Sequence, residues 1–297
     1  MKLKILDTKK AEKGSKELPS IFSEPVRQDL IKRAVEALQA NARQPYGAAP
    51  LAGKKASSKL SRRRRDYKGS YGHGISRSPR KILSRNGTRF NWVGAFAPNT
   101  VGGRPAHPPK PFAILSKKIN TKENRKAIRS AVAATLSKEL VKTRGHIAPA
   151  EYPFIISNEF ETISKTKNAY EALLNLGLEQ EMARAEEKTI RTGKSKLRGR
   201  HYRKRKSVLF VVAKECPLMK ASANIPGVET VTVNQLNAEL LAPGTVPGRL
   251  TLFTESAIER LDKEKLFYDN NSNKQAAEPK PAKAAKAANP DAKAKKQ

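Results

Sequence analysis

The sequence predicts an α/β protein: a mainly parallel sheet with helices on both faces, interrupted by a long extended basic loop and followed by a flexible C-terminal tail. Three observations predict it. Short apolar stretches alternate with stretches of helical periodicity, the order of βαβ units. Residues 43–112 contain sixteen Lys or Arg, nine Gly and eight Pro, with Asp66 as the only acid. Residues 269–297 are low-complexity Lys, Ala and Pro. We therefore expect a globular body over residues 1–42 and 113–268.

The body begins with a short strand and a helix. Residues 3–6 (LKIL) have strand character. Ser23 is a capping residue, and Pro25 is tolerated in a first helical turn. Apolar residues then recur every four positions, which predicts one buried helix face: Val26, Leu30, Ala34 and Leu38.

The long loop of residues 43–112 has sparse apolar residues without a lasting period, so it cannot bury enough surface to offset its ordering entropy. A 70-residue excursion, out and back, reaches up to about 115 Å when extended. One interpretation is a disordered, solvated insertion. Aromatic residues favour the other, which is ordering on a nucleic acid, because rings and Arg planes stack on unpaired bases. These rings are Tyr46, Tyr67, Tyr71, Phe90, Trp92 and Phe96.

A second helix is predicted over residues 118–142, with Gly145 after its end. Its apolar side comprises Ile128, Val132, Leu136 and Leu140. Its first half is crowded by cations, with only Glu123 opposing them: Lys117, Lys118, Lys122, Arg125, Lys126 and Arg129. Cations near a helix N-terminus oppose the macrodipole, so we expect a phosphate surface alongside. The alternative is a merely solvated basic face.

The rest of the body alternates strands and helices. The predicted strands are 153–156, 208–213, 228–233 and 250–253, and the predicted helices are 165–176, 178–191, 217–224, 234–241 and 254–261. Ser256 and Glu259 have capping-box spacing at the start of the last helix. The run 208–213 is almost wholly apolar, as expected for a strand with both faces covered.

The charge of the chain points to a polyanionic partner. Lys and Arg total 60 against 27 acids in 297 residues, a formal charge of +33. No apolar run approaches the roughly 18 residues of a spanning helix, and the first residues lack the apolar stretch of a signal peptide. The single cysteine, Cys216, is expected to pack at a strand end and excludes an internal disulfide framework. These features fit a reducing, non-secreted compartment, and we expect no membrane partner.

Motifs of catalysis are weak. Gly193-Lys194-Ser195 resembles the end of a P-loop, but the position that requires glycine holds Lys188, and the flanks look like a helix and a basic coil. The four histidines, His73, His107, His146 and His201, are scattered without metal-ligand spacing. No acid–base pair is evident. The sequence therefore predicts no enzyme activity, no cofactor, no metal and no small-molecule substrate.

The nucleic-acid signal is stronger. Residues 193–206 (GKSKLRGRHYRKRK) hold eight Lys or Arg, one Tyr and no acid. Phosphate neutralisation by many cations gives tight, salt-sensitive binding. Irregular, Gly-rich segments with aromatic residues suit folded RNA better than a duplex groove. Two other interpretations stay open: an RNA-processing or RNA-modifying enzyme with basic arms, and a nucleic-acid packaging protein.

Several motifs follow one another in a familiar order and spacing. They are residues 43–48 (RQPYGA), 101–110 (VGGRPAHPPK), 129–134 (RSAVAA), 191–203 (RTGKSKLRGRHYR), 224–227 (NIPG), 240–249 (LLAPGTVPGR) and 254–257 (TESA). Over residues 1–265 the chain closely resembles the archaeal and eukaryotic branch of the universal large-subunit ribosomal protein four family, and most of all its archaeal members. The resemblance implies a structural constituent of the large subunit that supports assembly.

It also implies a loop that threads through ribosomal RNA to the wall of the peptide exit tunnel, with its tip around residues 62–80. The tip residues are Arg64, Arg65, Tyr67, Lys68, Tyr71 and His73. The implied partners are large-subunit ribosomal RNA and neighbouring large-subunit proteins, with the chain as a monomer within the ribosome.

The residues predicted to bind RNA come from three separate segments. From the loop they are Arg43, Tyr46, Lys54, Lys55, Arg62, Arg63, Arg64, Arg65, Lys68, Arg77, Arg80, Lys81, Arg85, Arg89, Trp92, Arg104, His107 and Lys110. From the second helix they are Lys118, Lys122, Arg125 and Arg129. From residues 193–206 they are Lys194, Lys196, Arg198, Arg200, Tyr202, Arg203 and Arg205.

Overall fold

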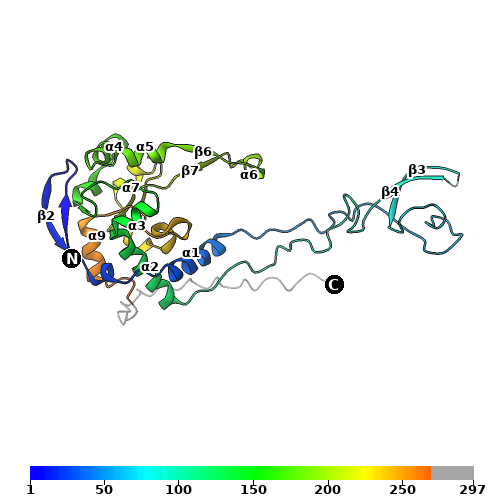
Figure 1. The fold of residues 1–297 in the computed structure, drawn as a ribbon, viewed down its shortest axis with the longest axis horizontal. Helices are drawn as coiled ribbons and strands as arrows, with labels where there is room; N and C mark the ends of the chain where they lie inside the picture. Colours follow the sequence, from blue (N-terminus) through cyan, green and yellow to red (C-terminus); the bar gives the residue numbers. More distant parts are fainter. Residues whose placement is uncertain (88, 269–297) are drawn as a thin grey trace, which may run out of the picture. The chain divides into compact units, whose positions relative to one another are not determined.

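The computed structural model describes residues 1–87 and 89–268 (Figure 1). The chain divides into two compact units. The body unit comprises Met1–Leu38 and the chain from Lys118 onward, and the loop unit comprises Gln39–Lys117. The predicted tail over 269–297 lies outside the described residues. Within the described part, no helix is long and apolar enough to cross a membrane.

Six strands of the body unit form two three-stranded sheets. The first has the order β2-β1-β5, from Glu12–Glu17, Lys2–Leu6 and Ile155–Ile156, and the second has the order β10-β8-β9, from Thr251–Phe253, Leu209–Val212 and Glu229–Thr232. The pairs β1–β5, β8–β10 and β8–β9 are parallel, whereas β1–β2 is antiparallel. One isolated parallel bridge, Ile156–Thr254, joins the two sheets. The α/β class is confirmed, but the single mainly parallel sheet is not what the structure shows.

Helices surround these sheets. The α-helices of the chain outside residues 188–204 are α1 (Gln28–Ala42), α2 (Thr121–Leu136), α3 (Lys138–Thr143), α4 (Thr166–Asn175), α5 (Glu179–Glu186), α7 (Pro217–Ser222), α8 (Ala238–Leu241) and α9 (Glu255–Lys263). Short 3₁₀ turns lie at Ser20–Ser23, Asn158–Thr162, Val233–Gln235 and Pro243–Thr245.

The apolar core lies on both faces of β8, because successive side chains of a strand point to opposite sides. Leu209 and Val211 belong to a cluster that includes residues of α1, α2 and α9. Phe210 and Val212 belong to a second cluster that includes residues of α4, α5 and α7. The wholly apolar composition of this strand is therefore explained by burial on both faces.

The first helix begins later than the sequence predicts. It starts at Gln28, and Ser23 instead ends a 3₁₀ turn. A residue distant in sequence holds this region in place: the backbone N–H of Arg27 donates to Oγ of Ser130 at 2.6 Å, and this hydroxyl donates to the carbonyl of Pro25 at 3.0 Å. The buried residues of α1 are Ile31, Ala34, Val35 and Ala37, so the predicted face is rotated.

Three other features of the secondary structure differ from the prediction. The helix expected over 118–142 is broken at Ser137 into α2 and α3. The capping residue of α9 is Thr254, whose hydroxyl accepts from the N–H of Ala257 at 3.2 Å, rather than Ser256. Strand β2 was not predicted, because its residues EKGSKE are polar and almost fully exposed.

The segment expected to be basic coil forms a hairpin of the body unit. Strands β6 (Lys188–Ile190) and β7 (Tyr202–Lys204) pair in antiparallel fashion, and the short helix α6 (Lys194–Leu197) lies between them (Figure 1). The helix expected over 178–191 ends at Glu186 for this reason.

The loop unit has its own secondary structure. Strands β3 (Arg80–Asn86) and β4 (Arg89–Gly94) form an antiparallel hairpin, which the sequence analysis missed (Figure 1). The two chain segments that lead to the hairpin are paired as well. The N–H of Ala48 donates to the carbonyl of Pro109 at 3.1 Å. A Cβ on Gly53, where φ is +70°, would lie 2.6 Å from Cα of Arg104. Only glycine allows the backbones to approach this closely there.

Candidate nucleic-acid interface

Most aromatic rings of the loop unit are paired with cations. The guanidinium carbon of Arg77 lies 4.5 Å from the ring centroid of Tyr71, and that of Arg85 lies 5.4 Å from Tyr67. Similar contacts of 5.3–5.7 Å join Arg43 to Tyr46, Arg80 to Trp92, Arg104 to Phe96 and Lys110 to Phe112. Such pairs hold flat surfaces and positive charges side by side, the two features that single-stranded nucleic acid recognises.

Three rings form a cluster on the β3–β4 hairpin and the segment before it. Phe90 and Trp92 stack with centroids 5.3 Å apart, and Tyr67 meets Phe90 edge-on at 5.4 Å. They line a cavity of about 860 Å³ together with His73 and cations that include Arg89. An open, ring-lined cavity with cations at its edge suits an unstacked base and its phosphate.

The only acid in the loop unit orders its backbone. Asp66 accepts from the N–H of Tyr67 at 2.8 Å through Oδ1 and from the hydroxyl of Ser61 through Oδ2. Its carbonyl accepts from the N–H of Gly69 at 3.0 Å. The bond from Ser61 is the main cause that lowers the pKa of Asp66, so the carboxylate is ionised at neutral pH. Arg65 and Lys68, on either side, have positive φ of 57° and 62°.

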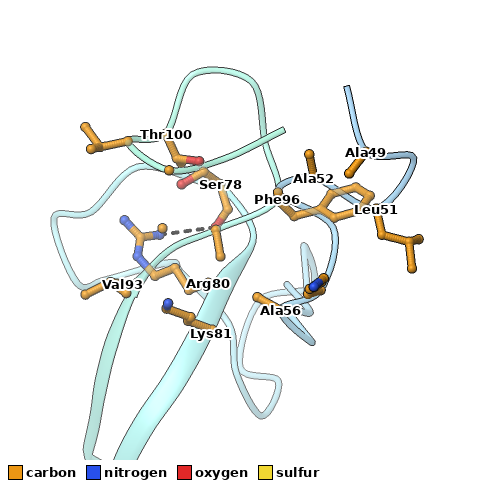
Figure 2. Close-up of a pocket in the computed structure, with 16 residues that line it drawn as sticks. Ala49, Leu51, Ala52, Ala56, Ser78, Arg80, Lys81, Val93, Phe96 and Thr100 are labelled. Atoms are coloured by element: carbon orange, nitrogen blue, oxygen red, sulfur yellow. Dashed lines mark hydrogen bonds between the residues drawn. The ribbon is translucent and has the colours of Figure 1, made fainter. Parts of the chain in front are cut away.

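A second cavity of the loop unit, of about 720 Å³, lies beside the start of β3 (Figure 2). Its wall combines apolar groups, among them Leu51 and Phe96, with Arg80 and Lys81. Figure 2 shows the Arg80 guanidinium turned to Ser78, whose carbonyl accepts from Nη1 at 3.3 Å. The guanidinium is thus positioned by local backbone, and this cavity has no acid in its lining.

The cations at the start of α2 divide into two groups. Lys118 and Lys122 are exposed. Arg129 is only 7% exposed, and its Nη1 donates to the carbonyl of Phe267 at 2.7 Å. Arg125 donates to the carbonyl of Tyr268 at 3.3 Å. Arg129 therefore fixes a chain segment inside the body unit, and its predicted contact with RNA stays a prediction. Position in sequence did not reveal it, because the partner lies far along the chain.

The hairpin of β6 and β7 presents the densest charge of the body unit. Every Lys and Arg from Lys194 to Lys206 is exposed, and so are Leu197 and Tyr202, at 86% and 55%. The backbone ladder is reinforced where Nε of Arg191 donates to the carbonyl of Tyr202 at 3.0 Å. Side chains with this exposure are available to a polyanion.

The flanks of Gly193 differ from the prediction: a three-residue strand precedes it and a four-residue helix follows it. The glycine required by a P-loop is still absent, because Lys188 lies within β6. The two strands are also antiparallel neighbours rather than parts of a parallel βαβ unit. The arrangement is a charged hairpin and not a nucleotide-binding loop.

Apart from Arg129, the predicted RNA-binding residues lie at or near the surface of their own unit. Half-buried are Lys68, Arg80, Trp92, Arg104 and Arg125, and exposed are Arg43, Tyr46, Lys54, Lys55, Arg62, Arg63, Arg64, Arg65, Arg77, Lys81, Arg85, Arg89, His107, Lys110, Lys118, Lys122, Lys194, Lys196, Arg198, Arg200, Tyr202, Arg203 and Arg205.

A buried polar network lies next to the start of the hairpin, and no pattern in the sequence predicted it. Glu181 is fully buried; it accepts from Nη2 of Arg184 at 2.6 Å and from Nδ1 of His146 at 2.7 Å. Its other oxygen accepts from the N–H of Ile147 at 2.9 Å. Burial by itself raises the pKa of Glu181, but these bonds outweigh burial and lower the pKa to about 2. Burial lowers the pKa of His146, so the imidazole is neutral and Nδ1–H is the donor.

Metal-ligating side chains do not gather in the structure. Among residues 1–87 and 89–268, no group of three or more His, Cys, Asp or Glu is arranged to hold a metal ion. Cys216 is half-buried and precedes α7 directly, and burial raises the pKa of its thiol.

Known proteins are similar in sequence to this chain over most of its length. The family model described as "Ribosomal protein L4/L1 family" matches residues 16–264. The chain is 47% identical over 269 residues to the large ribosomal subunit protein uL4 of Nanoarchaeum equitans, which covers 90% of this chain and all of the relative. It is 46% identical to the proteins of the same name from Archaeoglobus fulgidus and Methanococcoides burtonii, with 88% and 87% of this chain covered and 98% and 96% of the relatives. The chain therefore belongs to the ribosomal protein L4/L1 family.

Proposed function

We propose that this protein is a structural constituent of the large ribosomal subunit that binds large-subunit ribosomal RNA. The observation that supports this proposal most strongly is that the basic segments are exposed. The eight cations of residues 193–206 are all exposed on one hairpin, and the loop unit adds an array in which only Asp66 is acidic. The name shared by the archaeal relatives, large ribosomal subunit protein, supports this choice of polyanion.

Binding in this proposal is a matter of charge and stacking. Lys and Arg neutralise phosphates and release counterions, which makes the complex sensitive to salt. The ring cluster of Tyr67, Phe90 and Trp92 stacks on bases that RNA structure leaves unpaired. Glycine also has a packing role within the protein, because Gly53 allows its backbone to lie close to the backbone of Arg104 in the loop unit.

We further propose that the loop unit supports assembly and contributes to the wall of the peptide exit tunnel. The tip residues are Arg64, Arg65, Tyr67, Lys68, Tyr71 and His73. They surround the turn ordered by Asp66, which presents charged side chains around a defined backbone. The protein acts in the cytoplasm as a monomer within the subunit, and neighbouring ribosomal proteins are its other partners.

The competing function, an RNA-processing enzyme, needs a carboxylate or another reactive group beside the basic surfaces. Three acids near the hairpin are engaged by cations instead. Glu181 accepts from Arg184, Glu187 pairs with Arg205 at 2.7 Å, and Glu229 pairs with Arg249 at 2.6 Å. We propose no turnover for this protein.

Sedimentation of native extract in magnesium tests the proposal. The chain should travel with the large subunit and stay bound at moderate salt. Recovery mainly as free protein, or bound to DNA, contradicts it. A stoichiometric complex with an RNA-processing assembly that turns over substrate favours the competing function.

A further inference from the structure

A cavity of about 500 Å³ lies in the body unit where α3 ends and the β6–β7 hairpin begins. Six side chains of its lining are cations: Arg144, Arg184, Arg203, Lys204, Arg205 and Lys206. No acidic residue lines it. These residues come from three places in the sequence, and Arg144, Arg184, Lys204 and Lys206 were not among the predicted RNA-binding residues.

Only some of this charge is compensated by the protein. Arg184 pairs with Glu181, Arg205 pairs with Glu187, and Lys206 pairs with Glu229. Among the described residues, no carboxylate lies within ion-pair distance of Arg144, Arg203 or Lys204. Like charges held around one cavity repel each other, so an anion inside it stabilises the arrangement.

Arg144 supplies the most specific observation. Its Nε is buried and has no hydrogen-bond partner within the described chain. Burial, followed by the charges of Arg184, Arg249 and Arg203, lowers the pKa of this guanidinium. Buried donors in folded proteins are usually hydrogen-bonded, so a phosphate that accepts from this guanidinium would complete its bonding. Guanidinium groups are suited to phosphate oxygens because they donate two parallel bonds.

Two glycines of the lining leave room for a chain-like ligand. Gly145 and Gly244 line the cavity with φ of +95° and +75°, and a Cβ placed on either would meet no atom within 4 Å. Their backbones therefore border open space rather than packed side chains. A cavity of this volume exceeds the needs of one phosphate group.

We propose that this cavity binds two adjacent phosphate groups of an RNA backbone, with Arg144 and Arg203 as the principal ligands. The inference rests on the proposed function for the source of the phosphates. The site lies on the body unit itself, so it anchors RNA there independently of the loop unit. Inorganic pyrophosphate presents two linked phosphate groups to the same site. It therefore serves as a probe that carries neither bases nor sugars.

The test uses the full chain in isothermal titration calorimetry, with pyrophosphate and with a short polyuridylate in separate titrations. The pocket variant carries Arg144→Gln and Arg203→Gln. The matched control carries Arg198→Gln and Arg200→Gln, which remove the same charge from the same hairpin outside the cavity lining. Circular dichroism verifies that both variants fold.

We expect one pyrophosphate per wild-type chain. The pocket variant should lose about tenfold or more in pyrophosphate affinity, while the control stays within about twofold of wild type. Both should weaken polyuridylate binding, because both remove cations from the proposed RNA surface. Arg144→Lys, which keeps the charge but not the bidentate geometry, should have an intermediate pyrophosphate affinity.

Three results overturn the inference. Absence of stoichiometric pyrophosphate binding removes the site, and so do equal losses in the pocket and control variants. Loss of pyrophosphate binding with unchanged polyuridylate affinity assigns the cavity to free phosphate compounds instead of RNA. None of these results bears on co-sedimentation with the large subunit, so the proposed function stands or falls separately.

Discussion

Nη1 of the fully buried Arg249 lies 2.6 Å from Oε2 of Glu229. The same guanidinium donates from Nε to the carbonyl of Ser207 at 2.9 Å and from Nη1 to the carbonyl of Leu240 at 3.1 Å. It thereby joins the entry to β8, the start of β9 and helix α8. Burial lowers the pKa of Arg249 to about 10, and the group stays charged at neutral pH. Arg249 therefore holds in place the chain segment at Ser207, which follows the β6–β7 hairpin.

Arg249→Met should destabilise the body unit by about 3–5 kcal/mol, because it leaves a carboxylate and several carbonyls without their buried donor. Methionine has a similar length and fills most of the space. Urea unfolding of the purified chain, followed by circular dichroism, measures the free energy of unfolding. The control Arg198→Met, on the exposed hairpin tip, should change it by less than about 0.5 kcal/mol. Equal effects of the two substitutions contradict the role assigned to Arg249.

Glu181→Gln should remove an acid-sensitive part of the stability. The folded pKa of Glu181 is about 2, below the ordinary value of about 4.3, so its contribution is complete above pH 4.3 and is lost as the pH falls toward 2. The difference in unfolding free energy between wild type and variant should therefore shrink by about 2 kcal/mol between pH 5 and pH 2. Denaturant unfolding at a series of pH values measures this.

The matched control for this pH dependence is Glu187→Gln, because the Glu187 side chain is 66% exposed and pairs with Arg205 at the surface. Its difference from wild type should stay within about 1 kcal/mol across the same range. A Glu181→Gln difference that is independent of pH refutes the lowered pKa, whatever the absolute stability of the variant.

Trp92→Ala should weaken RNA binding without changing its salt dependence. Loss of a stacking ring costs about 1–3 kcal/mol per base, whereas loss of a phosphate contact reduces the salt slope by about 0.7–0.9. Affinity for a large-subunit ribosomal RNA fragment, measured across potassium concentrations, separates the two effects, with Arg198→Gln as the phosphate variant and Trp92→Phe as the ring-preserving control. Trp92 is the single tryptophan of the chain, so quenching of wild-type fluorescence by RNA reports on the loop unit alone. A reduced salt slope for Trp92→Ala argues against stacking.

Replacement of residues 60–79 by a short Gly-Ser linker should leave the body unit folded and impair the ribosome. The removed segment belongs wholly to the loop unit and ends before β3. The unfolding free energy of the free protein should stay within about 0.5 kcal/mol of wild type. In cells with this variant as sole copy, gradient profiles should show large-subunit precursors. An unfolded body after the replacement contradicts the division into two units.

Several elements were predictable because their pattern is local. The apolar run of β8, the helix positions Ile128 and Val132 of α2 and the break at Gly177 all follow from neighbouring residues, and Gly177 indeed has a φ of +78°. The motif order from residue 43 to 257 was enough to indicate the family.

Other features could not be predicted from the sequence, because the residues that cause them are distant along the chain. The start of α1 depends on Ser130, and the burial of Arg129 depends on Phe267. Strand β2 has no apolar alternation and exists because it pairs with β1. The hairpin β3–β4 is rich in cations and pairs Ile82 with Trp92 across the strands, and its register shifts between Ile82 and Ser84.

The sequence by itself determined the α/β class, the separate basic segments and the polyanionic partner, because composition, charge and short-range periodicity are properties of neighbouring residues. Only the tertiary structure decided which cations are available. It buried Arg249 and Arg129, and it brought Arg144, Arg184 and Arg203 into the lining of one cavity. Desolvation and mutual repulsion depend on distances in space, and those are set by packing between residues far apart in the chain.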